Sequence, residues 1–238
     1  MKNSSNKKAD SFSKISWEDF LELCKKTSQK NKISSSFLWS MSSHFMKNQP
    51  MEIQKKYYEN LGVFNKAGNP LGKANWYFVY KFGCVHTASS ILVIDKTDKI
   101  ILIQERSKNV SWAGLLDTSA GGCFPDKIIS KKQRLDYLIH ELSEEIFSNY
   151  RPKNISRSTL KEISKTYLEV KDREFIKRQF LYFYTFALDP ADKEKIKKNW
   201  ESADLKWMTA DQIKKISKKE LAPGLKTALA TIEIDKLF

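Results

Sequence analysis

The chain has 238 residues, of which 41% are hydrophobic, and its 42 Lys and Arg against 28 Asp and Glu give a net charge of +14. It is long enough for one sizeable domain and an appendage. It contains no apolar run of the roughly 18 residues that a membrane-spanning helix needs, and its polar N-terminus does not resemble a signal peptide. These features predict a protein that does not insert in a membrane.

The cysteine content and the net charge indicate the cellular compartment and the kind of ligand to expect. Cys24, Cys84 and Cys123 are odd in number and widely spaced, which is typical of free thiols in a reducing cytoplasm. We therefore expect a cytoplasmic protein. The positive charge favours phosphate-bearing small ligands and allows nonspecific nucleic-acid binding, although a lysine-rich composition also fits an AT-rich genome.

The first 60 residues predict a tail and a helical extension. Residues 1–14 are rich in Ser, Lys and Asn and are expected to be disordered. Residues 15–60 are expected to be helical, with Ser16 as an N-cap and two more helices around Pro50. This extension is either a packing appendage or a cap or dimer arm that shapes the substrate site, so a homodimer remains open. Its large apolar side chains are Phe37, Trp39, Met41, Phe45, Met46, Tyr57 and Tyr58.

Residues 61–238 read as one α/β domain. The first strands are expected at Trp76–Tyr80, Ala88–Asp95 and Ile100–Glu105, with a hairpin turn at 95–98. Ser130 and Gln133 form a capping box that opens a long amphipathic helix. Two strands and three helices are expected after it, at 159–170, 177–187, 191–199, 211–216 and 223–234. This order, without a strict βαβ repeat, predicts an α/β/α sandwich around a mixed sheet.

The long helix carries three carboxylates on one side. At about 100° per residue, Glu141, Glu144 and Glu145 share one face, while leucines and isoleucines occupy an adjacent one. Like charges at these spacings repel, and Mg²⁺ or Mn²⁺ would remove that repulsion because both prefer carboxylate oxygens. A solvated acidic face is the ordinary alternative for such a triplet.

The residues before this helix resemble the Nudix box. The family pattern has glycine and an upstream glutamate, then Arg-Glu-hydrophobic-any-Glu-Glu, and Gly121-Gly122 followed by His140-Glu141-Leu142-Ser143-Glu144-Glu145 is similar to it. The 86–106 hairpin and Asp204–Met208 resemble the first hairpin and last strand of the family. The similarity extends roughly over residues 60–230, and is greatest to the branch related to isopentenyl diphosphate isomerase.

The box departs from the family pattern at several positions. His140 replaces the arginine, Phe147 replaces the terminal glycine, the preceding loop is longer, and no upstream glutamate matches. Ala120 and Gly122 stand where the isomerase has its catalytic Cys and a metal-binding His, which argues against isomerase activity.

The resemblance implies a Nudix-type fold and a Mg²⁺-dependent (or Mn²⁺-dependent) pyrophosphohydrolase acting on a small-molecule diphosphate, such as a nucleoside diphosphate derivative. It implies metal binding by Glu141, Glu144 and Glu145, with Glu144, Glu145 or the later Glu174 acting in catalysis. Arg106, Gly121 and Gly122 would contact the phosphates. The departures support an alternative, a degenerate Nudix domain that binds a nucleotide, RNA or protein without turnover.

Overall fold

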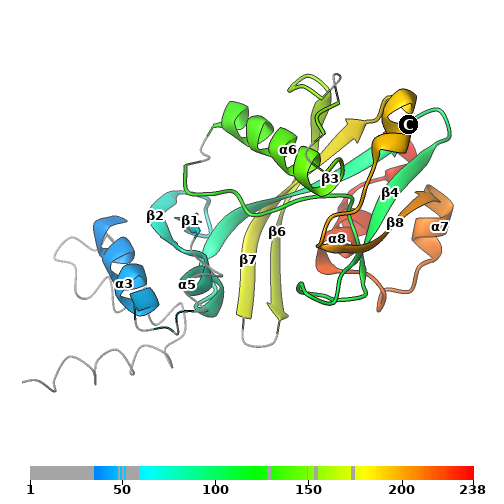
Figure 1. Cartoon of the computed structure of the whole chain (residues 1–238). Helices are drawn as coiled ribbons and strands as arrows, with labels where there is room; N and C mark the ends of the chain where they lie inside the picture. The colour runs from blue at the N-terminus through cyan, green and yellow to red at the C-terminus, as the bar shows by residue number, and fades with distance from the viewer. Residues whose placement is uncertain are drawn as a thin grey trace, which may run out of the picture. The chain divides into compact units, whose positions relative to one another are not determined.

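The computed structural model describes residues 35–47, 49, 51, 59–127, 130–148, 150–152, 155–172 and 175–238 (Figure 1). The expected disordered tail and the helix predicted to begin at Ser16 lie outside these residues. The chain forms two compact units. Of the described residues, those up to 87, with 125–127 and 169–179, belong to the first unit, and those within 88–124, 128–168 and 180–238 belong to the second. Among the described residues, no helix is long and apolar enough to span a membrane.

In the first unit, part of the predicted helical extension packs on a small antiparallel ladder. Strand β1 (Asn60–Phe64) pairs with β2 (Pro70–Asn75), and helix α3 (Ser35–Lys47) packs on β2. The Asn75 amide donates to Oγ of Ser42 at 2.6 Å, and both Ser42 and Leu38 are fully buried. The extension is therefore a packed helix over 35–47. Residues 52–58, where the next predicted helix would lie, are outside the described residues.

The strand predicted at Trp76–Tyr80 is wrong, because this segment forms helix α5 (Trp76–Lys81). Asn75 is its N-cap, and its side chain accepts from the Tyr77 amide at 2.9 Å. The Phe45 ring of α3 contacts Tyr77, Phe78 and Phe82, with ring centroids 5.3–5.9 Å apart. A short apolar run that is buried on all sides has no periodicity that separates a helix from a strand.

The second unit contains the predicted hairpin, which is confirmed. Strand β3 (Val85–Asp95), whose first residues belong to the first unit, pairs with β4 (Ile100–Arg106) antiparallel. Strand β4 also pairs antiparallel with β5 (Leu116–Asp117) and with β8 (Ser202–Thr209), the predicted last strand. Asp95 shapes the β3–β4 turn by accepting from the amides of Thr97 and Asp98.

Helices cover both faces of this sheet. Alternate residues of a strand point to opposite faces, and Ile91, Val93 and Leu102 pack against α6 (Lys131–Glu145). Their neighbours on the other face pack against α7 (Ala210–Lys215) and α8 (Pro223–Thr231), through Leu92, Ile94, Ile101, Ile103, Ile213 and Leu225. Each fully buried leucine or isoleucine stabilises this arrangement by about 1.5–3 kcal/mol. The predicted α/β/α sandwich is confirmed.

The remaining elements complete the sheet and its edges (Figure 1). Strands β6 (Leu160–Asp172) and β7 (Phe175–Ala187) form a long hairpin, and β7 also pairs with β3. The helix expected at 191–199 is a short 3₁₀ helix, η1 (Pro190–Lys195), and a second one, η2 (Ile234–Leu237), ends the chain.

Candidate active site

Local capping and packing fix the orientation of α6. Oγ of Ser130 accepts from the Gln133 amide at 3.2 Å, and Oε1 of Gln133 accepts from the Ser130 amide at 2.9 Å, so the predicted capping box is present. Leu138 and Leu142 are fully buried against the sheet. Because the helix cannot rotate without exposing these leucines, its last two turns hold the glutamates in one place.

Glu141, which is half-buried, and Glu145, which is buried, form a carboxylate pair. Glu145 is only 7% exposed, and its side chain shares a hydrogen bond with that of Glu141. Burial raises the pKa of Glu145 well above its usual range, and the charges of Glu141 and Glu201 raise it further. Burial also raises the pKa of Glu141, although the hydrogen bonds from Glu145 and Tyr137 oppose that rise. The pair therefore retains a proton at a higher pH than ordinary carboxyl groups, unless a cation replaces it.

Gly121 and Gly122, which the sequence predicts to contact metal and phosphates, bring the backbone against these carboxylates. The Gly121 amide donates to the Glu145 carboxylate. A Cβ on Gly121 would lie 2.3 Å from the backbone oxygen of Ser89 in β3, so this position needs glycine. A Cβ on Gly122 would lie 3.0 Å from Oε2 of Glu141. The two glycines thus allow the chain to pack against β3 and the Glu141 carboxylate to approach the backbone closely.

Glu144 lies at the exposed side of this cluster. Its carboxylate is 3.6 Å from Nδ1 of His140, and the two side chains are 53% and 72% exposed. That distance is too long for a hydrogen bond, so His140 holds Glu144 only when it is protonated. The charge of Glu144 still raises the pKa of both Glu141 and Glu201.

Glu201 is a site residue that the sequence analysis missed. Its backbone oxygen accepts from the Ser107 amide at 2.7 Å, and the next residue, Ser202, pairs with Arg106 across the β4–β8 ladder. Burial raises its pKa, the Arg106 charge opposes the rise, and Glu141 and Glu144 add to it. The sequence contained a signal for Glu201. Antiparallel pairing places the start of the last strand, which follows Glu201, beside the end of the strand that finishes at Arg106.

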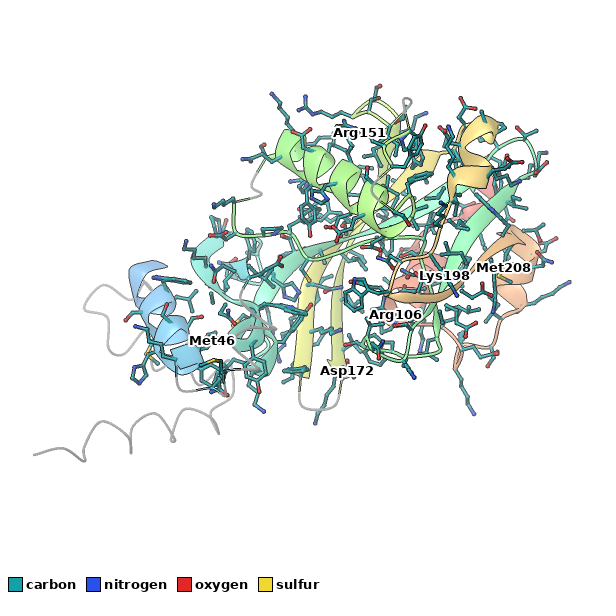
Figure 2. All side chains as sticks on the ribbon, viewed as in Figure 1. Met46, Arg106, Arg151, Asp172, Lys198 and Met208 are labelled. Atoms are coloured by element: carbon teal, nitrogen blue, oxygen red, sulfur yellow. The ribbon has the colours of Figure 1, made fainter. Side chains whose placement is uncertain are left out.

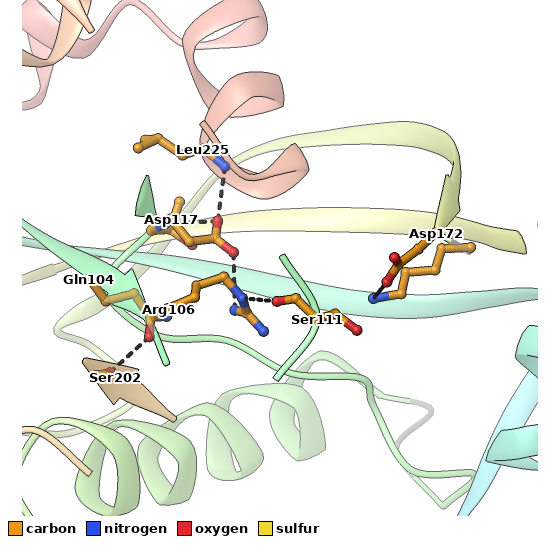
Figure 3. Close-up of polar contacts among 9 residues, drawn as sticks. Gln104, Arg106, Ser111, Asp117, Asp172, Ser202 and Leu225 are labelled. Carbon is orange, nitrogen blue, oxygen red and sulfur yellow. Dashed lines mark hydrogen bonds and ion pairs between the residues drawn. The ribbon is translucent and has the colours of Figure 1, made fainter. Parts of the chain in front are cut away.

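Arg106 is held at the end of β4 by two fixed partners, which Figure 3 shows. Its Nε donates to the Ser111 carbonyl at 2.7 Å, and its Nη1 is 3.2 Å from Oδ2 of Asp117. The other oxygen of Asp117 accepts from the Leu225 amide at 3.0 Å, in the first turn of α8. The guanidinium is mostly buried and close enough to Glu201 to lower the pKa of that residue.

A serine and a glutamine hold the chain beside Arg106. Oγ of Ser202 donates to Oε1 of Gln104 at 2.9 Å, and both side chains are buried (Figure 3). This bond ties the start of β8 to β4 next to the glutamate cluster. Figure 2 shows Arg106 among the surrounding side chains. The β4–β8 ends and the last turns of α6 therefore meet around one group of charged residues.

The carboxylate oxygens of this cluster are suitable ligands for a hard divalent cation. Among the described residues, no three histidine, cysteine or acidic side chains are already arranged to hold a metal ion. The Glu141–Glu145 pair nevertheless shares a hydrogen bond that requires a proton, and carboxylate oxygens are the ligands that Mg²⁺ and Mn²⁺ prefer. Glu174, the predicted later glutamate, lies outside the described residues.

Comparison with known proteins identifies the fold. No protein-family model matches the sequence, and no curated protein matches it. The DR0079 protein from Deinococcus radiodurans is 15% identical over 72% of this chain and 98% of its own, with a TM-score of 0.53. A Nudix hydrolase from M. smegmatis, RenU, is 17% identical over 71% of this chain and 89% of its own, with a TM-score of 0.41. A MutT protein from Methanosarcina mazei is 14% identical over 60% and 88%, with a TM-score of 0.44.

Proposed function

We propose that this chain, which has the Nudix fold, is a Mg²⁺-dependent or Mn²⁺-dependent hydrolase. Its substrate would be a nucleoside diphosphate derivative or a related small-molecule diphosphate, cleaved at the diphosphate linkage. The observation that carries the proposal is the Glu141–Glu145 pair, a half-buried and a buried carboxyl group beside Gly121 and Gly122, whose pKa values are raised because both groups are largely removed from water. Two neighbouring carboxylates that are largely removed from water and have no counter-ion lower the stability of the fold. A bound cation offsets that cost.

Each residue of the cluster has a role in this proposal. Glu141, Glu144 and Glu145 would hold the metal ion, which when bound neutralises phosphoryl oxygens and lowers the pKa of water. Arg106, kept in one orientation by Asp117 and Ser111, would donate to a phosphate oxygen. Gly122, which has no side chain, lets the backbone lie close to the Glu141 carboxylate, so its amide is a candidate donor to a phosphate bound there.

The proton acceptor is a carboxylate beside the glutamates that would hold the metal ion. Glu144 is exposed and is placed to accept a proton at the rim of the cluster. Glu201, which the Arg106 charge keeps more acidic than burial alone would allow, is placed beside it. Glu174 remains a further candidate from the sequence.

The test is a pyrophosphohydrolase assay with Mg²⁺ or Mn²⁺ on a panel of nucleoside diphosphate derivatives. Glu145→Gln should lower kcat by about 10²-fold or more, because it removes a group that acts in the transition state. Glu194→Gln, the same change at an exposed glutamate of η1, is the matched control. Inactivity of the wild type on every diphosphate, or equal activity of wild type and Glu145→Gln, would refute the proposal.

A second candidate is a Nudix domain that binds its ligand without turnover. It is supported by the weak His140–Glu144 contact, where the family pattern has arginine, and by the lack of a preformed three-ligand group among the described side chains. Calorimetric titration separates the two proposals. Ligand binding without Mg²⁺ or Mn²⁺ binding favours the binding module, whereas activity gained by His140→Arg favours a damaged hydrolase.

A further inference from the structure

The β6–β7 hairpin carries a row of alternating rings and cations in the second unit. The rings of Tyr167 and Phe180 lie 5.7 Å apart, and Nζ of Lys165 lies 4.8 Å from the Phe180 ring centroid and 5.0 Å from that of Tyr182. The Arg134 guanidinium of α6 lies 4.6 Å from the same Tyr182 ring. We call Tyr167, Phe180, Lys165, Tyr182 and Arg134 the aromatic–cation row.

The outer strand presents much of this row to solvent. Alternate residues of β6 are exposed, and they include Lys161, Ile163, Lys165 and Tyr167. Ile163 is 36% exposed and Tyr167 is 39% exposed, which is high for large side chains in a strand. The opposite face of β7 is fully buried through Leu181 and Phe183, so the hairpin cannot turn this row inward.

One acidic residue beside the row, Glu162, interacts with residues of the same surface. Glu162 lies 3.8 Å from Arg134, and its carboxylate accepts from the Tyr184 hydroxyl at 3.2 Å. Lys161 and Lys165 flank it on the exposed strand. The surface therefore combines positive charge with ring faces on a chain whose net charge is +14.

We propose that the aromatic–cation row binds single-stranded nucleic acid. Aromatic rings stack on unpaired bases, and lysines between the rings contact the phosphates that link those bases. The bases of a duplex are stacked on each other, so their faces cannot reach the rings. A strongly basic protein also attracts a polyanion over a longer range than it attracts a neutral protein partner.

This surface is separate from the glutamate cluster. Arg134 lies in the first turn of α6 and Glu141 begins the acidic part seven positions later, about 10 Å along the axis. The proposal therefore does not depend on hydrolase activity, and its variants leave the candidate active site intact.

The chain offers a matched pair of residues for the test. Tyr150 is 40% exposed, and Nζ of Lys195 lies 4.7 Å from its ring centroid. Tyr150→Ala and Lys195→Gln thus repeat the changes Tyr167→Ala and Lys165→Gln at an exposed tyrosine and a lysine that lie outside the aromatic–cation row but in the same unit. The full-length protein is used throughout, and each variant is first checked for an unchanged melting temperature.

Binding is measured by fluorescence anisotropy with labelled oligo(U) and oligo(dT) of about 12 nucleotides, and with a duplex of the same length. Tyr167→Ala should weaken binding of the single strands about tenfold, as expected when one stacked base is lost. Lys165→Gln should weaken binding and reduce the slope of log affinity against log salt by about 0.7. The two control variants should bind almost as the wild type does.

Four outcomes would overturn the proposal. The first is absence of binding at low salt, and the second is tighter binding of the duplex than of the single strands. The third is an equal loss of affinity in the Tyr167 and Lys165 variants and in the Tyr150 and Lys195 variants, which would show that binding depends on overall charge alone. The fourth is a dimer in light scattering that Tyr167→Ala or Lys165→Gln dissociates, because the occupant of the row would then be a second copy of the chain.

Discussion

Gly122 lies directly against the Glu141 carboxylate. A Cβ on this glycine would lie 3.0 Å from Oε2 of Glu141 and 3.3 Å from the Tyr137 hydroxyl, which itself donates to Glu141. The absence of a side chain at this position therefore lets the Glu141 carboxylate and the Tyr137 hydroxyl lie close to the backbone. Both neighbours are ends of flexible side chains, so a methyl group would displace them without breaking the fold.

The first prediction follows from this contact. Gly122→Ala should fold with nearly wild-type stability but bind Mg²⁺ more weakly, because Glu141 must move from its place beside Glu145. Gly121→Ala is the contrasting variant. Its new methyl would meet the backbone of Ser89, which cannot move aside, so it should lower the free energy of unfolding by about 1–3 kcal/mol. Calorimetric Mg²⁺ titration and urea unfolding measure the two effects. Unchanged Mg²⁺ affinity in Gly122→Ala would contradict this assignment.

The second prediction concerns the stability of the glutamate pair. Burial raises the pKa of Glu141 and Glu145, so their contribution to stability is complete below their unfolded pKa and is lost as pH rises through the folded pKa. At neutral pH, saturating Mg²⁺ should therefore stabilise the protein, by about 2.7 kcal/mol at 100 times the dissociation constant.

Differential scanning calorimetry at pH 7.5, with and without Mg²⁺, measures this effect. Glu145→Gln should raise the melting temperature of the metal-free protein and abolish the Mg²⁺ response, since it removes the buried charge. Glu194→Gln should do neither. A Mg²⁺ response that persists in Glu145→Gln would show that the ion binds elsewhere.

The third prediction tests the position of Glu201. Its negative charge raises the pKa of Glu145, so Glu201→Gln should lower that pKa. The acidic limb of the profile of log kcat/KM against pH should then move to lower pH. Glu220→Gln, at the exposed residue whose carbonyl pairs with Leu116, is the control. If the acidic limb does not move, the charge of Glu201 does not affect the pKa of Glu145.

The fourth prediction concerns His86 in the first unit, where the ring is fully buried and Nδ1 lies 3.2 Å from the Cys84 carbonyl. Burial lowers the pKa of His86 from 6.5 to about 4. Between these values the unfolded chain binds a proton that the folded chain does not, so stability is complete above pH 6.5 and is lost as pH falls toward 4.

Unfolding by urea at pH 7 and pH 5 measures this loss, which should be about 2 kcal/mol. His86→Gln should remove much of the difference between the two pH values, although it lowers stability at both. His140→Gln, at a histidine that is 72% exposed, should leave the difference intact. An unchanged difference in His86→Gln would assign it to other groups.

Sequence patterns determined the elements whose own periodicity is strong. The β-rich runs of β3 and β4, separated by a turn at 95–98, predicted a hairpin, and the structure covers its two faces with α6 on one side and α7 and α8 on the other. The capping box and the leucine spacing of α6 likewise fixed which face carries Glu141 and Glu145. These features depend on residues that are close together in the sequence, so a local sequence pattern is enough to predict them.

Only the tertiary structure decided the features that depend on distant partners. The segment 76–81 became a helix because Asn75 caps it and Phe45 of another helix covers it, and no local period distinguishes that outcome from a strand. Glu201 joined the glutamate cluster because the β4–β8 register brings it beside Arg106, and Asp117 fixed that arginine through a contact with the first turn of α8. Charges separated by tens of residues raise or lower each other's pKa only after the chain has buried them together, so the sequence alone could name the candidate residues but not their protonation.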